Sequence, residues 1–360
     1  MAITATDTTI LLKPINAIFQ QTFLRRAQQV CPYFTGTQPG SLARQGGTAT
    51  VKWRRIEQLA TSTTALTELT STVSFMGGRS SATPTITDVL ATVSKYGQYY
   101  LVNEGVDLYN PNGTTAELVG TLGESAGRSL NQLMRNVTEG SSTLRYAHNV
   151  ASKAAVHAIV TTGDLNRSIN ELSKNSARTF MGMTSGSTNI NTVPILPSYW
   201  GICHPDVAAD IAGLTGFVSV ERYNTQTQVQ TGEFGYYSLA GRGVRFIQSE
   251  DASVSLGGGA ALSGADLNTT SSKTDVYVIS LYGQDALGSV GLGMKQTDGI
   301  YMAGENTGGW EIIHHPRGSA GASDPFNELE TISYKAFFAG AVLNSNWSRA
   351  LLVAATNLTN

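Results

Sequence analysis

The pattern of apolar and polar positions is clearest between residues 114 and 140. Apolar side chains recur there at steps of three and four, at Val119, Leu122, Ala126, Leu130, Leu133 and Val137. This spacing predicts an amphipathic helix with one apolar stripe. Thr114 and Glu117 have the spacing of a capping box, and Gly140 is a natural stop, so we expect a long helix with its body at 115–139.

A second stripe, made of small residues, runs beside the apolar one and consists of Ala116, Gly120, Gly123 and Gly127. Each glycine inside a helix costs about 1 kcal/mol relative to alanine, so another backbone must approach closely to offset the loss. We expect a sheet to lie across this stripe; a core helix with accidental glycines is the alternative. The predicted packing residues are Val119, Gly120, Leu122, Gly123, Ala126, Gly127, Leu130 and Leu133.

The far face of the same helix is charged. It carries Glu117, Glu124, Arg128 and Arg135. Glu124 and Arg128 are four residues apart, which is the spacing of an ion pair along a helix. We therefore expect these two side chains to pair with each other.

Upstream of the helix the pattern changes to a period of two. Residues 48–57 alternate as a strand does, with Lys52 and Arg54 on one side and Val51, Trp53 and Arg55 on the other. A second strand is expected at 86–95. The segment between them, 58–85, is nearly all Thr, Ser, Ala and Leu and is too long for an ordinary connection. This predicts a protruding hairpin arm, with a disordered surface loop as the alternative.

Other segments give a mixture of helices and strands, and the expected fold class is α+β. The predicted helices are 15–30, 103–109 with Asn103 as its cap, a helix capped by Asp164, one starting at His204-Pro205-Asp206, and a helix-like stretch at 284–290. The predicted strands are 98–102 after an interruption at Tyr96-Gly97, 144–146, 199–203, 244–248, 276–282, 310–314, 329–343 and 349–353.

Composition narrows the possible functions. The 360-residue chain has a net charge of -2, and 14% of its residues are charged. This argues against a dedicated nucleic-acid binder, which needs clustered Lys and Arg. A weakly charged chain is expected if partners cover much of its surface. The start lacks the basic region of a secretion signal, and no apolar run is long enough to cross a membrane.

The chemistry-bearing residues form no recognisable site. Cys31 and Cys203 have no metal-ligand spacing, and the adjacent His314 and His315 would point to opposite faces of a strand. Phosphate-loop, nucleophile-elbow and paired-carboxylate patterns are also missing. We therefore predict no catalytic, metal or cofactor site. Arg54-Arg55 could touch nucleic acid, but the nearby Glu57 favours a salt bridge between proteins.

The order of these elements resembles that of a known family. Four stretches carry the resemblance: KYGQYYLVNEGVDLYN, YWGICHPDVAADI, GEFGYYSLAGRGVRFIQSE and YKAFFAGAVLNSNW. In combination and order they are similar to the major capsid proteins of tailed bacteriophages, in the podophage-type branch, whose shell fold is named for phage Hong Kong 97. The resemblance covers nearly the whole chain, although no single motif is a strict signature.

The resemblance implies a division of the chain. Residues 1–46 would be an N-terminal arm and helix, and 47–88 an extended loop that reaches over a neighbouring subunit. Residues 89–195 and 303–360 would form a peripheral domain around the long spine helix, and 196–302 an axial domain. The candidate inter-subunit contacts are Lys52, Trp53, Arg54, Arg55, Glu57, Glu68 and Arg79.

The resemblance also implies a function. The protein would assemble as hexamers and pentamers into an icosahedral shell around double-stranded DNA. The expected partners are other copies of the chain, a scaffolding protein, a portal, a decoration protein as a further candidate, and packaged DNA through non-specific contacts. The charged helix face would be left for solvent, DNA or a neighbouring subunit. The protein would occur in the virion, and in the host cytoplasm during assembly. Another phage head or tail component, or an enzyme with an unseen site, are the alternatives.

Overall fold

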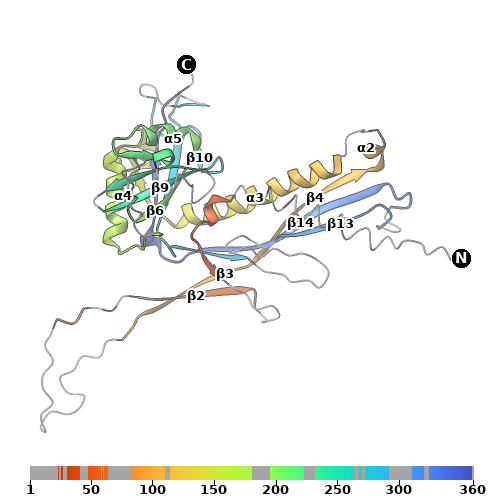
Figure 1. Cartoon of the computed structure of the whole chain (residues 1–360), viewed down its shortest axis with the longest axis horizontal. Helices are drawn as coiled ribbons and strands as arrows, with labels where there is room; N and C mark the ends of the chain where they lie inside the picture. The colour runs from red at the N-terminus through yellow and green to blue at the C-terminus, as the bar shows by residue number, and fades with distance from the viewer. Residues whose placement is uncertain are drawn as a thin grey trace, which may run out of the picture.

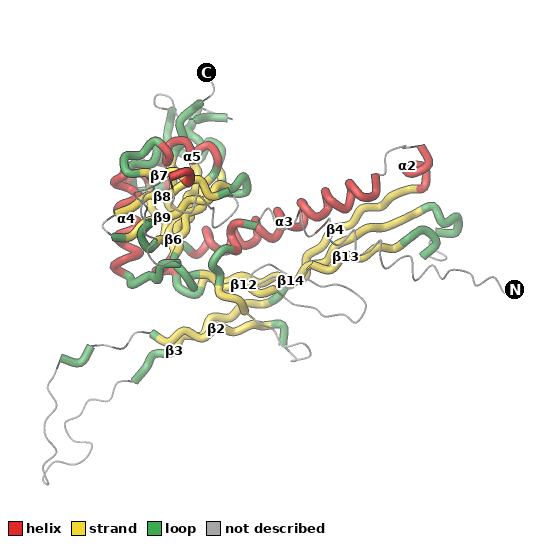
Figure 2. The backbone as a smooth tube through the Cα atoms, viewed as in Figure 1, coloured by secondary structure: helices red, strands yellow, loops and turns green. Residues whose placement is uncertain are grey.

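A long helix lying along an extended sheet dominates the computed structural model (Figure 1). The structure describes residues 23, 26, 31–40, 48–57, 59, 61–63, 83–109, 114–180, 195–222, 232–239, 241–262, 267–269, 272–291, 310–319 and 324–358. Among these, the strands form a five-stranded sheet, an eight-stranded sheet and a two-stranded ribbon (Figure 2). The mixture confirms the predicted α+β class. The arm at 1–14 lies outside the described residues.

The five-stranded sheet is built around the long strand β14 (Leu329–Val342). On one side β14 pairs with β4 (Ser94–Asn103), and on the other with β12 (Leu287–Gly291) and then β13 (Trp310–His315). The short β1 (Gln38–Gly40) adds to β12. β12 and β13 follow one another along the edge of β14 opposite β4. Phe338 pairs with both Gly291 of β12 and Ser94 of β4, and Ala336 pairs with both Trp310 of β13 and Tyr96 of β4.

The helix α3 (Thr114–Ser141) covers one face of this sheet. Its apolar stripe packs on the even-numbered side chains of β14 in one core. The helix contributes Val119, Leu122, Ala126, Leu130 and Met134, and β14 contributes Ile332, Tyr334, Ala336 and Phe338. Leu133 packs at the margin of the same core. The helix ends one residue beyond the expected stop at Gly140.

The glycine stripe of α3 does not face the sheet, so that prediction is wrong. A Cβ atom at Gly123 would lie 2.6 Å from the carbonyl oxygen of Phe23, and one at Gly120 would lie 2.7 Å from Arg26 Nη1. Phe23 and Arg26 are helical and belong to the helix predicted at 15–30. The glycines therefore admit the N-terminal segment, whose backbone could not approach a larger residue at Gly123 so closely.

The eight-stranded sheet has the order β5-β15-β11-β6-β9-β8-β7, with β10 paired to β11. Its strands are β5 (Thr143–Tyr146), β6 (Ser198–Cys203), β7 (Phe217–Ser219), β8 (Glu233–Leu239), β9 (Arg242–Gln248), β10 (Val254–Ser255), β11 (Val276–Tyr282) and β15 (Ser348–Val353). One face packs on α4 (Thr162–Lys174) and α5 (Pro205–Ala212). Trp200 and Ile202 on the other face of β6 join the core under α3.

Sheet membership crosses the division implied by the resemblance. β5 and β15, from segments expected in the peripheral domain, pair into the eight-stranded sheet. β12, from the segment expected in the axial domain, pairs into the five-stranded sheet. The domain limits themselves remain a prediction.

Three local predictions need correction. Residues 284–290 are not helical, because Asp285 has a φ of 58° and the chain then enters β12. Tyr96 and Gly97 do not interrupt a strand: β4 runs through both, and a Cβ atom at Gly97 would lie 2.6 Å from the Tyr334 carbonyl oxygen. The cap of α4 is Thr161, with Asp164 completing its capping box.

The charged face of α3 also differs from expectation. Arg128 Nε lies 3.4 Å from Asp251 Oδ1, and Arg135 Nη1 donates to the Asp251 carbonyl oxygen at 2.6 Å. Glu124 pairs with Arg26 at 3.3 Å, although Arg128 is four residues away. Arg128 and Arg135 thus bind the turn after β9, although the Arg128 side chain remains 53% exposed. Contact of this face with DNA or a neighbouring subunit stays a prediction.

Candidate subunit interface

The ribbon of β2 (Thr50–Ile56) and β3 (Ile86–Thr92) has an inner face that packs on its own chain. Val51 and Trp53 are buried there. They pack on Val290, Ala339 and Ala341 of the five-stranded sheet and on Leu343, which follows β14. Trp53, which is 6% exposed, lies against two glycines: a Cβ atom would come within 2.5 Å of its ring at Gly40 and 2.9 Å at Gly288. Trp53 therefore anchors the ribbon and offers little surface to a neighbour.

The outer face of the ribbon is exposed and carries a small charge cluster. Asp88 Oδ2 lies 2.5 Å from Lys52 Nζ, and Asp88 Oδ1 lies 3.0 Å from Arg54 Nε. The hydrogen bonds from Arg54 and then Lys52 lower the pKa of the Asp88 carboxyl. The cluster is flanked by three exposed apolar side chains, Ile56, Ile86 and Leu90. Apolar and charged side chains thus alternate along a surface that the described part of the chain leaves exposed.

Arg55 and Glu57 interact within the chain where the hairpin leaves the sheet. Arg55 Nε donates to Glu57 Oε1 at 2.8 Å, and Arg55 Nη1 donates to the Leu343 carbonyl oxygen at 2.7 Å. The hydrogen bond from Arg55 lowers the pKa of Glu57. Thr87 Oγ1 also donates to Glu57. These groups join the end of β2 to Leu343 and to Thr87 of β3. The other two candidates, Glu68 and Arg79, lie outside the described residues.

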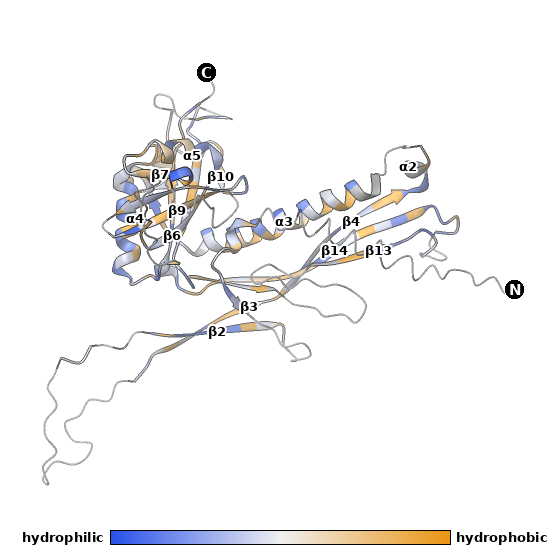
Figure 3. Cartoon of the chain, in the orientation of Figure 1, coloured by the Kyte–Doolittle hydropathy of each residue, from blue (hydrophilic) through white to orange (hydrophobic). Residues whose placement is uncertain are grey.

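Beyond the ribbon, the face of the five-stranded sheet opposite α3 is open as far as the described residues go. Residues paired across neighbouring strands point to the same face. Leu101 lies opposite Thr331, which lies opposite His315, and Tyr99 lies opposite Ser333. Tyr99 is 68% exposed and Leu101 57% exposed. Figure 3 shows hydrophobic colouring near the end of β4.

Exposed apolar side chains continue around the end of this sheet. The helix α2 (Glu104–Tyr109) follows β4 and is tied to the strand by Asn103 Oδ1, which accepts from Gly105 N at 3.0 Å. Tyr109 is 83% exposed, and Phe326, before β14, is 80% exposed. A cluster of this kind marks an interaction site more often than single exposed residues do. We call Tyr99, Leu101, Leu108, Tyr109 and Phe326 the end patch.

Sequence reasoning missed the end patch, but a signal was present. The segment KYGQYYLVN has apolar side chains at both odd and even positions. On a strand this places apolar groups on both faces. One set, Tyr100 and Val102, faces α3, and the other belongs to the end patch.

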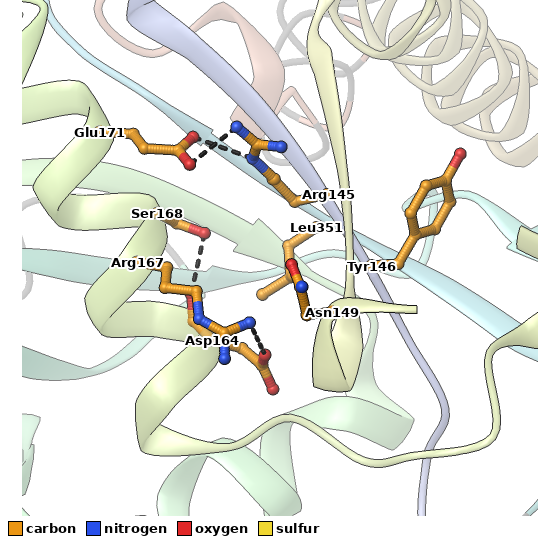
Figure 4. A pocket seen from close by; sticks show the side chains of 8 residues that line it. All are labelled: Arg145, Tyr146, Asn149, Asp164, Arg167, Ser168, Glu171 and Leu351. Carbon is orange, nitrogen blue, oxygen red and sulfur yellow. Dashed lines mark hydrogen bonds and ion pairs between the residues drawn. The ribbon is translucent and has the colours of Figure 1, made fainter. Parts of the chain in front are cut away.

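A small polar cavity lies elsewhere, between β5 and α4 (Figure 4). Its volume is about 80 Å³. Glu171 pairs there with Arg145 at 2.7 Å and with Arg349 at 3.0 Å, and Asp164 accepts from His148 N at 3.1 Å. Burial alone would raise the pKa of Glu171, but the hydrogen bonds from Arg145 and Arg349 outweigh it and lower that pKa. The charges satisfy one another, so the arrangement is that of a structural network.

Within the described residues no cluster of His, Cys, Asp and Glu could hold a metal ion. Both cysteines are buried, and burial raises the pKa of the Cys31 thiol to about 12. None of the described helices combines the length and the hydropathy of a membrane span.

Comparison with known proteins identifies the fold. No protein-family model and no curated protein sequence matches the chain. Among solved structures, the capsid of Ralstonia phage GP4 matches with a TM-score of 0.58 at 7% identity, covering 91% of this chain and 89% of that one. The capsid of cyanophage P-SCSP1u matches with a TM-score of 0.53 at 9% identity, covering 91% and 89%. The head of Helicobacter pylori bacteriophage KHP40 matches with a TM-score of 0.53 at 11% identity, covering 91% and 92%. The chain therefore has the fold of phage capsid proteins of the Hong Kong 97 type.

Proposed function

We propose that this chain is the major capsid protein of a tailed phage, which assembles as hexamers and pentamers into an icosahedral shell around double-stranded DNA. The observation that carries the proposal is the shared fold, which extends over about nine-tenths of this chain and of each solved phage capsid. A fold shared over the full length, and not over one module, is expected when the whole chain serves one structural role.

The exposed surfaces support assembly from copies of this chain. The end patch, which includes Tyr99 and Leu101 of the open sheet face, and the outer face of the ribbon both carry exposed apolar side chains. Obligate interfaces bury large apolar areas, and a chain that exposes two such surfaces gains free energy when copies cover them. The low share of charged residues favours the same arrangement.

The ribbon supports contact with a neighbour in a specific way. Trp53 fixes the base of the ribbon on its own sheet, and Arg55 with Glu57 joins the end of β2 to the residue after β14 and to β3. Lys52 and Arg54 share one carboxylate, so the outer face retains a positive charge for an acidic group of a neighbour. In this proposal Lys52 and Arg54 contact the neighbouring subunit, whereas Trp53, Arg55 and Glu57 position the ribbon.

In this proposal the protein is located in the virion and has no catalytic role. Its near-neutral charge suits a container whose wall makes weak, sequence-independent contacts with packaged DNA. A scaffolding protein, a portal and a decoration protein belong to the proposal as further partners of the assembling shell, and assembly itself takes place in the host cytoplasm.

The test is to express the full chain alone and with a scaffolding protein, and to examine it by sedimentation and negative-stain microscopy. We expect hexamer-sized or megadalton particles and closed shells. A matched variant that lacks 59–83 retains β2 and β3. It should fold but form no shells. Open tubes would favour a tail component, and a compact monomer under every condition would overturn the proposal.

A further inference from the structure

The polar network between β5 and α4 has a cationic outer side. Between residues 143 and 178 the chain has five lysines and arginines and only two carboxylates, whereas its net charge over all 360 residues is -2. The side chain of Asp164 is 2% exposed and that of Glu171 27% exposed, but their partners Arg167 and Arg145 are 56% and 46% exposed. The positive member of each pair therefore faces solvent more than the negative one (Figure 4).

The two carboxylates are held on their inner side and orient the guanidinium groups outward. Asp164 Oδ1 accepts a hydrogen bond from His148 N at 3.1 Å. Glu171 Oε2 accepts from Nε of the buried Arg349 at 3.0 Å. Arg145 uses its Nε and Nη2 towards the same carboxylate. A guanidinium has five N–H donors in a rigid fork, so Arg145 has further donors for a second anion.

The helix α4 extends the cationic side. Arg167 and Lys174 are seven residues apart, which is two helical turns, so they lie on one side of the helix about 10 Å apart. Asn170 lies between them, and all three side chains are exposed. The buried residues of the helix are Asp164, Leu165, Ser168, Ile169 and Leu172. The exposed side chains of α4 are therefore two cations and an amide.

Beyond the end of α4, Arg178 adds a further cation. Its side chain is 70% exposed, and its guanidinium carbon lies 6.0 Å from the centre of the Trp347 ring. Arg178 Nη1 lies 3.9 Å from Asp285 Oδ2, which is longer than a hydrogen bond. Trp347 Nε1 donates to the Asn175 carbonyl oxygen at 2.9 Å and so joins this position to the end of the helix. We call Arg145, Arg167, Lys174 and Arg178 the basic row.

The composition of the basic row suits a phosphate backbone better than a protein surface. Protein interfaces have an apolar core, whereas interfaces with DNA are more polar and much more positively charged. The end patch and the outer face of the ribbon have exposed apolar side chains, but the exposed side chains of α4 are all polar. Successive phosphates of one DNA strand advance by about 3.4 Å along the duplex, so two cations about 10 Å apart span about three phosphates.

We propose that the basic row binds the phosphate backbone of double-stranded DNA without reading its sequence, and so turns the α4 side of the eight-stranded sheet towards the packaged genome. The inference rests on the proposed function, which supplies the DNA. Arg145 and Arg167 donate N–H groups to phosphate oxygens, and Lys174 and Arg178 add positive charge along the same backbone. Each contact releases counterions from the DNA, so the affinity falls as the salt concentration rises.

The test is a fluorescence-anisotropy titration of a labelled duplex of roughly 30 base pairs with the unassembled full-length chain, between about 50 and about 200 mM NaCl. Arg167→Gln with Lys174→Gln should weaken binding roughly tenfold or more at the lowest salt. Its plot of log affinity against log salt should be less steep by about 2, because two phosphate contacts are lost. Arg178→Gln alone should reduce that slope by about 1.

The matched control removes two exposed cations elsewhere and changes the net charge by the same amount. Lys95→Gln on β4 and Arg222→Gln in the turn η5 (Val220–Arg222) together serve this purpose. The control pair should bind the duplex with the wild-type affinity and salt slope. Equal losses in the two pairs would overturn the basic row as the contact, because they would show an effect of net charge alone.

Two further outcomes would overturn the proposal. One is a wild-type chain that does not bind the duplex at the lowest salt. The other is displacement of the labelled duplex by polyglutamate as effectively as by unlabelled DNA of equal charge concentration, which would assign the row to an acidic protein. Particle formation is a separate readout. Shells that form from a chain without DNA binding would refute the row alone, whereas DNA binding without particles would refute only the proposed function.

Discussion

The eight-stranded and five-stranded sheets differ in how their strands are covered. Every residue of β6 and β15 is buried in the first, between α4, α5 and the core under α3. In the second, β4 is exposed along most of its length, because α3 covers one face and the ribbon covers part of the other. The central strands of the eight-stranded sheet are thus covered within the chain, whereas the five-stranded sheet presents surface suited to partner copies.

The largest effect is expected in the completed sheet. Phe246 on β9 is fully buried and packs against Phe234 at a ring-centroid distance of 6.0 Å. Phe246→Ala should lower the free energy of unfolding by about 3–5 kcal/mol, because it removes buried area and leaves a cavity. Leu101→Ala, on the open sheet face, should change it by less than about 0.5 kcal/mol. Urea denaturation measures the free energy of unfolding of both variants. Equal losses in the two variants would contradict the difference in coverage between the sheets.

A smaller effect is expected where the N-terminal segment crosses α3. Gly123→Leu would force the Phe23 backbone away from the helix and should cost about 1–3 kcal/mol. Gly140→Ala is the matched control, since nothing lies within 4 Å of a Cβ atom there and alanine favours the helix. Thermal unfolding of both variants tests this difference. Unchanged stability of Gly123→Leu would mean that the segment is held elsewhere.

The spacing of apolar residues correctly predicted the elements that pack on one continuous core. The apolar stripe of α3 and the strands at 199–203 and 276–282 could be read from spacing because each packs on a continuous core. The glycine stripe showed that a backbone must come close, but not which one. Spacing along one helix contains no information on whether a sheet or a distant segment such as Phe23 fills the space.

The features that the sequence analysis mispredicted depend on contacts between residues that are distant in sequence. β12 contains Gly288, which the Trp53 ring approaches closely, and its partner β14 lies some 50 positions away in sequence. Arg128 satisfies Asp251 and not Glu124, because the turn after β9 presents a buried carboxylate to it. The end patch depends on which face of β4 receives α3. Each of these features could be predicted only by knowing which residues are neighbours in three dimensions.

The central claim, that the five-stranded sheet is completed by other copies of the chain, is tested most directly by measuring particle mass for paired variants. Tyr99→Asp with Leu101→Asp places charge on the open sheet face, and Tyr99→Phe with Leu101→Met keeps it apolar. Mass photometry should show particles for the wild type and the apolar pair and only unassembled, folded protein for the charged pair. Wild-type particles from the charged pair would contradict the account.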